Sequence, residues 1–168
     1  MRLLTPHFIF KNVTRITPAF LQQQGIKALV LDVDNTLTEH GSQLLRPEIE
    51  NWLATMRENG VRLGIVSNNF EKRVGPFAGK LGLDYVSFSC KPFPRGLAVM
   101  RRKWGVQRSE MALVGDQIYT DALAARLYGV RVLLVKPLAE DIKPGIRFKR
   151  HLEAPVISRY YKKGGKLL

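Results

Sequence analysis

The stretch Leu29–Thr38, LVLDVDNTLT, joins an aliphatic run to two carboxylates that lie one residue apart. Residues two apart on a strand point to the same side, so Asp32 and Asp34 would share a direction at the end of this strand. Two like charges this close repel each other and lose hydration when buried, unless a cation lies between them. The alternative is structural, because Asp and Asn often end strands by bonding the backbone. A cation-binding group at the strand end is the hypothesis that the rest of the chain tests.

Short apolar segments alternate with helical patterns from Lys27 to Lys136. Several of the apolar segments are aliphatic throughout, which is typical of strands covered on both faces. This alternation predicts a three-layer, doubly wound, Rossmann-like α/β fold with a parallel sheet of about five strands. In such sheets, ligands bind at the carboxyl ends of the strands. The expected strands are residues 27–33, 61–66, 83–89, 110–115 and 130–136, and the expected helices lie within residues 46–60, 70–81, 94–105 and 118–129.

A chain of 168 residues has the length of one domain. Residues 1–25 are expected to form an N-terminal arm, with a short helix that starts at Thr17-Pro18 and ends at Gly25. Residues 27–136 would be the catalytic core, and residues 137–168 a basic C-terminal segment. Its apolar residues have roughly helical spacing, interrupted by Pro155. That segment could be a helix packed on the domain, a helix on a membrane surface, or a partly disordered tail.

The charge balance favours anionic partners. The chain has 27 Lys and Arg against 14 Asp and Glu, a net charge of +13. Nucleic acid, the ribosome, an anionic lipid surface or a phosphate-bearing substrate would all suit it, although a basic surface can also serve solubility alone. No apolar run approaches the roughly 20 residues of a membrane span, and the N-terminus lacks a signal-peptide pattern, so we expect a cytoplasmic protein. The single cysteine, Cys90, excludes an internal disulfide and is expected to be a small packed residue.

Four polar motifs follow the expected strands in order. DVDNTLT supplies Asp32 and Asp34, GIVSNN supplies Ser67, SCKPFP supplies Lys91, and LVGDQIYTD supplies Asp116 and Asp121. In this order, over about 90 residues, they resemble motifs I to IV of the haloacid dehalogenase superfamily of phosphotransferases. Within it, the chain looks most like the YqeG-type phosphatases of subclass III, which are related to the mitochondrial phosphatidylglycerophosphate phosphatase of fungi.

The resemblance implies a role for each carboxylate. Asp32 would be the nucleophile that forms an aspartyl-phosphate, and Asp34 would protonate the leaving oxygen and then deprotonate the attacking water. Mg²⁺ would be held by Asp32, the main-chain carbonyl of Asp34, and Asp116. Asp121 would orient a metal-bound water or cap the helix on which it lies.

The resemblance also implies a phosphate-binding group. Ser67, Lys91 and the backbone N–H of Asn68 would bind the phosphoryl oxygens, since phosphoryl transfer depends on positioning and charge neutralisation. Taken alone, Lys91 could equally be one of many surface lysines. Its place in the order of motifs favours the phosphate-binding role.

The spacing between motifs leaves no room for a cap domain, because a loop, helices and strands already fill both intervals from Thr36 to Lys91. An open site suits a phosphate carried on a bulky partner. Three functions fit: a Mg²⁺-dependent phosphatase of phosphatidylglycerophosphate in peripheral contact with an anionic membrane; a phosphatase of nucleotides, sugar phosphates or nucleic-acid ends; or a non-catalytic module that binds RNA or the ribosome. The intact acidic residues and Lys91 favour an enzyme, and the resemblance favours the lipid substrate.

Overall fold

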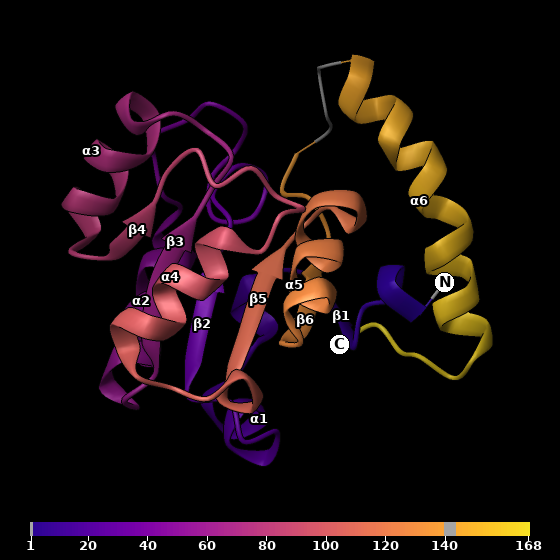
Figure 1. The fold of residues 1–168 in the computed structure, drawn as a ribbon, viewed down its shortest axis with the longest axis horizontal. Helices are drawn as coiled ribbons and strands as arrows, with labels where there is room; N and C mark the ends of the chain where they lie inside the picture. Colours follow the sequence, from indigo (N-terminus) through magenta and orange to yellow (C-terminus); the bar gives the residue numbers. More distant parts are fainter. Residues whose placement is uncertain (1, 140–143) are drawn as a thin grey trace.

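A parallel sheet of six strands forms the centre of the molecule (Figure 1). The computed structural model describes residues 2–139 and 144–168, and within them the strand order is β1-β6-β5-β2-β3-β4. The three-layer, doubly wound α/β class is confirmed, with one strand more than the expected five. The strands are β1 (Phe8–Phe10), β2 (Ala28–Leu31), β3 (Arg62–Val66), β4 (Asp84–Val86), β5 (Met111–Gly115) and β6 (Arg131–Val135).

Helices cover both faces of the sheet (Figure 1). The α-helices are α1 (Pro18–Gln23), α2 (Pro47–Glu58), α3 (Glu71–Leu81), α4 (Arg95–Trp104), α5 (Leu123–Tyr128) and α6 (Pro144–Lys162). The shorter turns are η1 (Arg2–Leu4), η2 (Val13–Arg15), η3 (Arg108–Glu110) and η4 (Ile118–Ala122). Each of the four helical patterns expected between residues 46 and 129 contains a helix. The short helix expected in the N-terminal arm is confirmed as α1.

Alternate residues of each strand enter two separate hydrophobic cores. In β2, Leu29 and Leu31 face the core formed with α1, α2 and α3, whereas Ala28 and Val30 face the core formed with α4 and α5. All four side chains are fully buried. An aliphatic strand without polar alternation is therefore explained by its central position, because both of its faces are covered.

The N-terminal arm supplies the strand that sequence analysis missed. β1 pairs with β6, with Ile9 opposite Leu134. The C-terminus then adds a further bridge, in which the Leu168 N–H donates to the Ile9 carbonyl at 2.9 Å and the Lys11 N–H donates to the Leu168 carbonyl at 2.8 Å. The segment around β1 and the last two residues thus meet at the same edge of the sheet.

The basic C-terminal segment contains a helix that packs on the domain. α6 continues through Pro155, and its Tyr160 is buried against the core that also holds α4 and α5. The Tyr160 hydroxyl donates to the Lys166 carbonyl at 3.1 Å. Of the three expected alternatives, the packed helix is the one that the described residues show; residues 140–143 of this segment lie outside them. Within the described ranges, no helix is both long and apolar enough to cross a membrane.

We predict that Tyr160→Ala lowers the free energy of unfolding by about 3 kcal/mol, because it removes a buried aromatic side chain that joins α6 to the core. Tyr161→Ala is the matched control: Tyr161 is 37% exposed against 8% for Tyr160. It should cost about 1 kcal/mol or less. Urea denaturation measures both. Equal effects of the two substitutions would contradict the packing of α6.

Candidate active site

The four motifs meet at the carboxyl edge of the sheet. Asp32 follows β2, Ser67 follows β3, Lys91 lies in the loop after β4, and Asp116 follows β5. The adjacent strands β5, β2, β3 and β4 of one parallel sheet bring these loops together, although the residues are up to 84 positions apart in the chain. One cavity of about 200 Å³ is lined by Asp32, Asp34, Ser67, Asn68 and Lys91, together with Lys149 of α6.

Lys91 is the cation that the carboxylates require. Its Nζ donates to Asp32 Oδ1 at 2.6 Å and to Asp121 Oδ1 at 2.7 Å, and its side chain is 3% exposed. Burial opposes the ammonium charge, but the two carboxylates outweigh it and hold the pKa of Lys91 above its ordinary value. The expected cation therefore exists, but it bridges Asp32 to Asp121 and not to Asp34.

The side chain of Asn68 holds the loop that carries Lys91. Its Oδ1 accepts from the Lys91 N–H at 2.6 Å and from the Ser89 hydroxyl at 2.9 Å, while its Nδ2 donates to the Lys91 carbonyl at 2.9 Å. The motif resemblance implied only a backbone role for Asn68 in binding phosphate, and that role stays a prediction. The structure adds a positioning contact between the second and third motifs.

Asp34 lies in a different environment from Asp32. Its carboxylate accepts from Arg73 at 3.0 Å, from Asn69 Nδ2 at 2.6 Å and from the Gly41 N–H at 3.1 Å. Burial works against ionisation here, yet the hydrogen bonds from Asn69 and Gly41 and the Arg73 guanidinium together hold the pKa of Asp34 below its ordinary value. Arg73 and Asn69 are site residues that sequence analysis missed. Their position in the sequence could have indicated this role. Both follow Ser67, in the loop after β3 or the first turn of α3, and this loop begins at the same edge of the sheet as the site.

Three buried carboxylates form a cluster suited to a metal ion. Single oxygens of Asp32, Asp116 and Asp121 lie within 4.8 Å of one another. Burial, partly offset by Lys91, raises the pKa of Asp32 to about 6, and burial, partly offset by Arg150, raises the pKa of Asp116 to about 8. Because burial is the main cause of both shifts, a cation bound at the cluster would favour the ionised carboxylates. An all-oxygen donor set of this kind fits a hard divalent cation.

Asp121 reaches the cluster because the backbone beneath it has no side chain. A Cβ on Gly115 would lie 2.3 Å from Asp121 Cγ, so only glycine allows this approach. Asp121 Oδ2 also accepts from the Gln117 N–H at 3.1 Å, at the start of the single π-turn η4. Asp121 therefore bonds the backbone of its turn, as expected for a cap, and also joins the acidic cluster.

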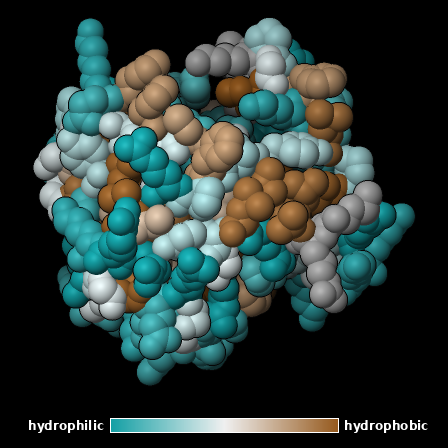
Figure 2. Space-filling view, in the orientation of Figure 1, coloured by the Kyte–Doolittle hydropathy of each residue, from teal (hydrophilic) through white to brown (hydrophobic). Residues whose placement is uncertain are grey.

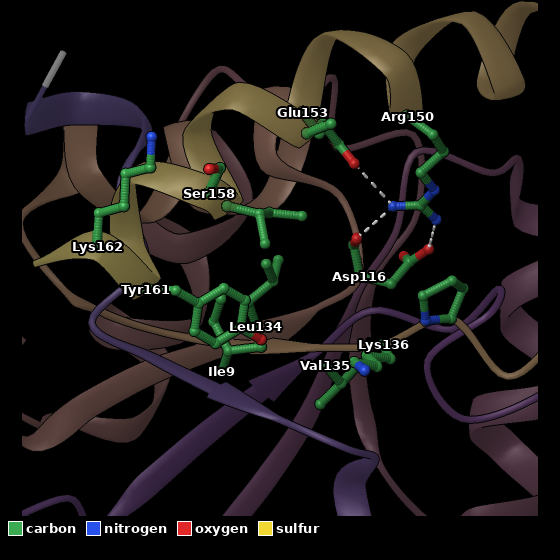
Figure 3. A pocket seen from close by; sticks show the side chains of 13 residues that line it. Ile9, Asp116, Leu134, Val135, Lys136, Arg150, Glu153, Ser158, Tyr161 and Lys162 are labelled. Carbon is green, nitrogen blue, oxygen red and sulfur yellow. Dashed lines mark hydrogen bonds and ion pairs between the residues drawn. The ribbon is translucent and has the colours of Figure 1, made fainter. Parts of the chain in front are cut away.

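α6 covers part of the site (Figure 3). Arg150 forms an ion pair with the Asp116 carboxylate, and it contacts Glu153 Oε2 at 3.1 Å. Glu153 Oε1 accepts from the Ile118 N–H at 2.6 Å, which ties the helix to η4. The expected open site is therefore corrected: no domain is inserted between Thr36 and Lys91, but the C-terminal helix lies over the acidic cluster. Nothing in the sequence signals this contact, because 34 positions separate Asp116 from Arg150.

A second cavity, of about 620 Å³, lies between α6 and the ends of β1 and β6 (Figure 3). Its walls are mainly apolar, with Ile9, Leu134 and Ile157 among them, and it shares Asp116 and Arg150 with the neighbouring site. One further expectation was wrong. Cys90 is exposed and not packed, because the loop after β4 turns its side chain outward while Lys91 points inward.

Comparison with known proteins agrees with this geometry. A family model described as haloacid dehalogenase-like hydrolase matches residues 40–129, and one described as mitochondrial PGP phosphatase matches residues 1–74. The chain therefore belongs to the haloacid dehalogenase-like hydrolases. It is 31% identical over 163 residues to the probable phosphatase YqeG of Bacillus subtilis, an alignment that covers 97% of this chain and 95% of that protein. The resemblance to YqeG-type phosphatases is thus confirmed.

Two further similarities are more distant. The chain is 28% identical over 177 residues to the chloroplastic/mitochondrial phosphatidylglycerophosphate phosphatase 1 of Arabidopsis thaliana, where it spans 97% of its own length and 50% of the plant protein. The crystal structure of a 4-nitrophenylphosphatase from Thermotoga maritima shares the fold, with a TM-score of 0.58 and 16% identity, over 73% of this chain and 89% of that chain.

We predict that Lys91→Ala lowers the free energy of unfolding by about 3–5 kcal/mol in excess chelator, because it leaves two buried carboxylates without their cation. The loss should be larger at pH 8 than at pH 5, since protonation relieves the unpaired charges at low pH. Lys72→Ala, at an exposed position on α3, is the matched control and should change stability by about 0.5 kcal/mol or less. A loss that does not depend on pH would contradict the electrostatic role of Lys91.

Proposed function

We propose that this haloacid dehalogenase-like phosphatase hydrolyses a phosphate monoester through an aspartyl-phosphate on Asp32, and that its substrate is phosphatidylglycerophosphate. One observation carries the chemistry. Asp32, Ser67, Asn68 and Lys91 line one small cavity, which supports a nucleophilic carboxylate beside the hydroxyl, N–H and ammonium groups that phosphoryl oxygens require.

Asp32 is the proposed nucleophile. One of its oxygens attacks phosphorus, the bond from phosphorus to the ester oxygen breaks, and the electron pair leaves with that oxygen. Water then attacks phosphorus, and the carboxylate departs as inorganic phosphate forms. The attack needs the ionised carboxylate, and the Lys91 ammonium at 2.6 Å favours that form against the effect of burial.

Asp34 is the proposed acid and base. The second step needs a carboxylate that accepts a proton from water, and the contacts with Arg73 and Asn69 favour this ionised form. The first step needs the protonated form, which donates to the leaving oxygen. A phosphate dianion in the cavity supplies that condition, because a like charge beside Asp34 disfavours its ionisation and raises its pKa.

Mg²⁺ is the proposed cofactor. The carboxylates of Asp32 and Asp116 and the main-chain carbonyl of Asp34 would hold it, and the position of Asp121 in the acidic cluster supports a direct or water-mediated contact as well. When bound, the ion neutralises charge on the phosphoryl oxygens. A bound cation would also favour the ionised forms of Asp32 and Asp116, whose pKa values burial raises.

The size of the site supports a substrate whose bulk stays outside. A cavity of about 200 Å³ is smaller than the roughly 300–1,000 Å³ of pockets that enclose small-molecule ligands. It suits a phosphate at the tip of a larger molecule. The similarity to phosphatidylglycerophosphate phosphatases and the net charge of +13 support a glycerol lipid headgroup at an anionic membrane.

We predict that Mg²⁺ binds more tightly as pH rises from 6 to 8. Asp32 and Asp116 have raised pKa values, so each must lose its proton before it can bind the ion. For each proton released on binding, the affinity rises by up to about tenfold per pH unit. Isothermal titration calorimetry in buffers of different ionisation enthalpy measures affinity and proton release together. Asp116→Asn should abolish most of the binding. Affinity that stays constant across this range, or full turnover in excess chelator, is the result that opposes the metal assignment.

We predict that phosphate release from phosphatidylglycerophosphate in mixed micelles has a higher kcat/KM than release from nucleotides or sugar phosphates. The physical reason is that the small cavity binds only the phosphate, so discrimination must come from contacts outside it. Phosphate release is measured for each substrate at equal phosphate concentration. A soluble ester with far higher kcat/KM would contradict the lipid substrate and leave the phosphatase chemistry intact.

A further inference from the structure

Three large aromatic side chains are exposed beside the catalytic cavity. Phe70, Phe88 and Phe93 have exposed fractions of 70%, 55% and 70%. All three lie at the carboxyl edge of the sheet, in the segments that follow β3 and β4. Figure 2 shows separate hydrophobic side chains among hydrophilic ones along this upper edge, and a larger hydrophobic patch lower down, between α5 and α6. We call Phe70, Phe88 and Phe93 the aromatic rim.

Hydrogen bonds and adjacency in sequence connect the aromatic rim to the site. Phe70 and Phe88 stack at 5.3 Å between ring centroids, with an interplanar angle of 13°. The Phe88 N–H donates to the Asn69 carbonyl at 2.7 Å, and the Asn69 side chain in turn binds Asp34. Phe93 is two residues beyond Lys91. Asn69 and Lys91 both line the catalytic cavity, so the rim adjoins residues of the cavity wall and is not a remote surface.

The mutual stacking of Phe70 and Phe88 covers only part of these two side chains, and Phe93 is 70% exposed as well. Phe88 has a φ of +44°, in the left-handed region where a bulky side chain is strained. Its ring is then left more than half exposed to water, where apolar surface is unfavourable. A cluster of exposed aromatic side chains around a functional site is typical of a surface that another molecule covers.

The charges around the rim indicate what covers it. Lys72 and Arg95 are exposed in the first turns of α3 and α4, and Lys149 of α6 lies across the catalytic cavity. The adjacent acid, Glu71, accepts hydrogen bonds from the Tyr85 and Ser87 hydroxyls. Aromatic tips surrounded by cations match the interface of an anionic bilayer, where rings enter the headgroup region and cations meet the lipid phosphates.

We propose that the aromatic rim is a peripheral membrane-docking surface, which inserts into an anionic bilayer and turns the mouth of the catalytic cavity toward the lipid. This inference rests on the proposed function and gives it an orientation. It also replaces the alternative that the basic C-terminal segment is the part that rests on a membrane surface, through its Tyr160–Lys163 stretch. That stretch lies at the far end of α6 from the cavity (Figure 1), and Tyr160 is buried.

The test compares vesicle binding by three forms of the full chain: the wild type, the rim variant Phe70→Ser/Phe88→Asn/Phe93→Ser, and Leu127→Ser. Leu127 is 51% exposed on α5 and controls for loss of an exposed apolar side chain elsewhere. Asn replaces Phe88 because it tolerates a positive φ. Vesicles of phosphatidylcholine with phosphatidylglycerol are compared with phosphatidylcholine alone at low salt. Hydrolysis of soluble para-nitrophenyl phosphate checks that each variant is folded.

The rim variant should bind the anionic vesicles roughly tenfold more weakly or worse, since burial of one Phe side chain is enough for about a tenfold change in affinity. The Leu127→Ser control and soluble-ester hydrolysis should match wild type. The single variants Phe70→Ser and Phe93→Ser, each expected to weaken binding, decide the question if the triple variant does not fold.

Two results would overturn the docking surface. One is unchanged vesicle binding by the rim variants, with binding lost instead in Lys162→Gln/Lys163→Gln. The other is loss of single-stranded oligonucleotide binding by the rim variants while vesicle binding stays intact, which would assign the rings to base stacking. If the rim variants lose vesicle binding but a soluble ester is the better substrate, the docking surface is supported and the proposed lipid substrate fails.

Discussion

A buried ammonium group between two carboxylates is the constraint on which the rest of the site depends. Lys91 Nζ lies 2.6 Å from Asp32 and 2.7 Å from Asp121, almost without contact with solvent. Burial of these three charges is tolerable only together, because removal of one partner leaves a desolvated charge. The Asn68 contacts that hold the Lys91 loop, and the bare backbone of Gly115 beneath Asp121, both serve this arrangement. The order of strands in the sheet brings the contributing loops to one edge.

The two carboxylates of DVDNTLT have different hydrogen-bond partners and opposite pKa shifts, although they lie only two positions apart in the sequence. Asp32 lies with Asp116 and Asp121, and its pKa is raised to about 6, whereas Asp34 lies with Arg73 and Asn69 and its pKa is lowered. When their environments shift the pKa values of two identical side chains in opposite directions, the two side chains can perform different tasks. The contrast supports the proposal of Asp32 as nucleophile and Asp34 as proton carrier.

The central fold could be predicted well from the sequence, because the apolar segments read as strands are also the segments that are buried on both faces. The aliphatic run before Asp32 and the alternating helical patterns correctly indicated a doubly wound parallel sheet. β1 was missed because Phe8–Phe10 is only three residues long and pairs with β6, more than 120 positions away. The ion pair between Arg150 and Asp116 left no local pattern either, since a basic segment offers many equivalent cations. Cys90 was wrongly expected to be packed, because composition does not show which way a loop side chain turns.

α6 changes how the site is understood, because a C-terminal helix covers part of what the motif spacing suggested would be open. The central claim nevertheless concerns Asp32, and trapping the covalent intermediate tests it most directly. Borohydride reduction of acid-quenched enzyme converts an aspartyl-phosphate to homoserine, which mass spectrometry locates within the chain. The account predicts homoserine at position 32 after a brief reaction with substrate. Homoserine at position 34, 116 or 121, or its absence from an enzyme that is turning over rapidly, would contradict it.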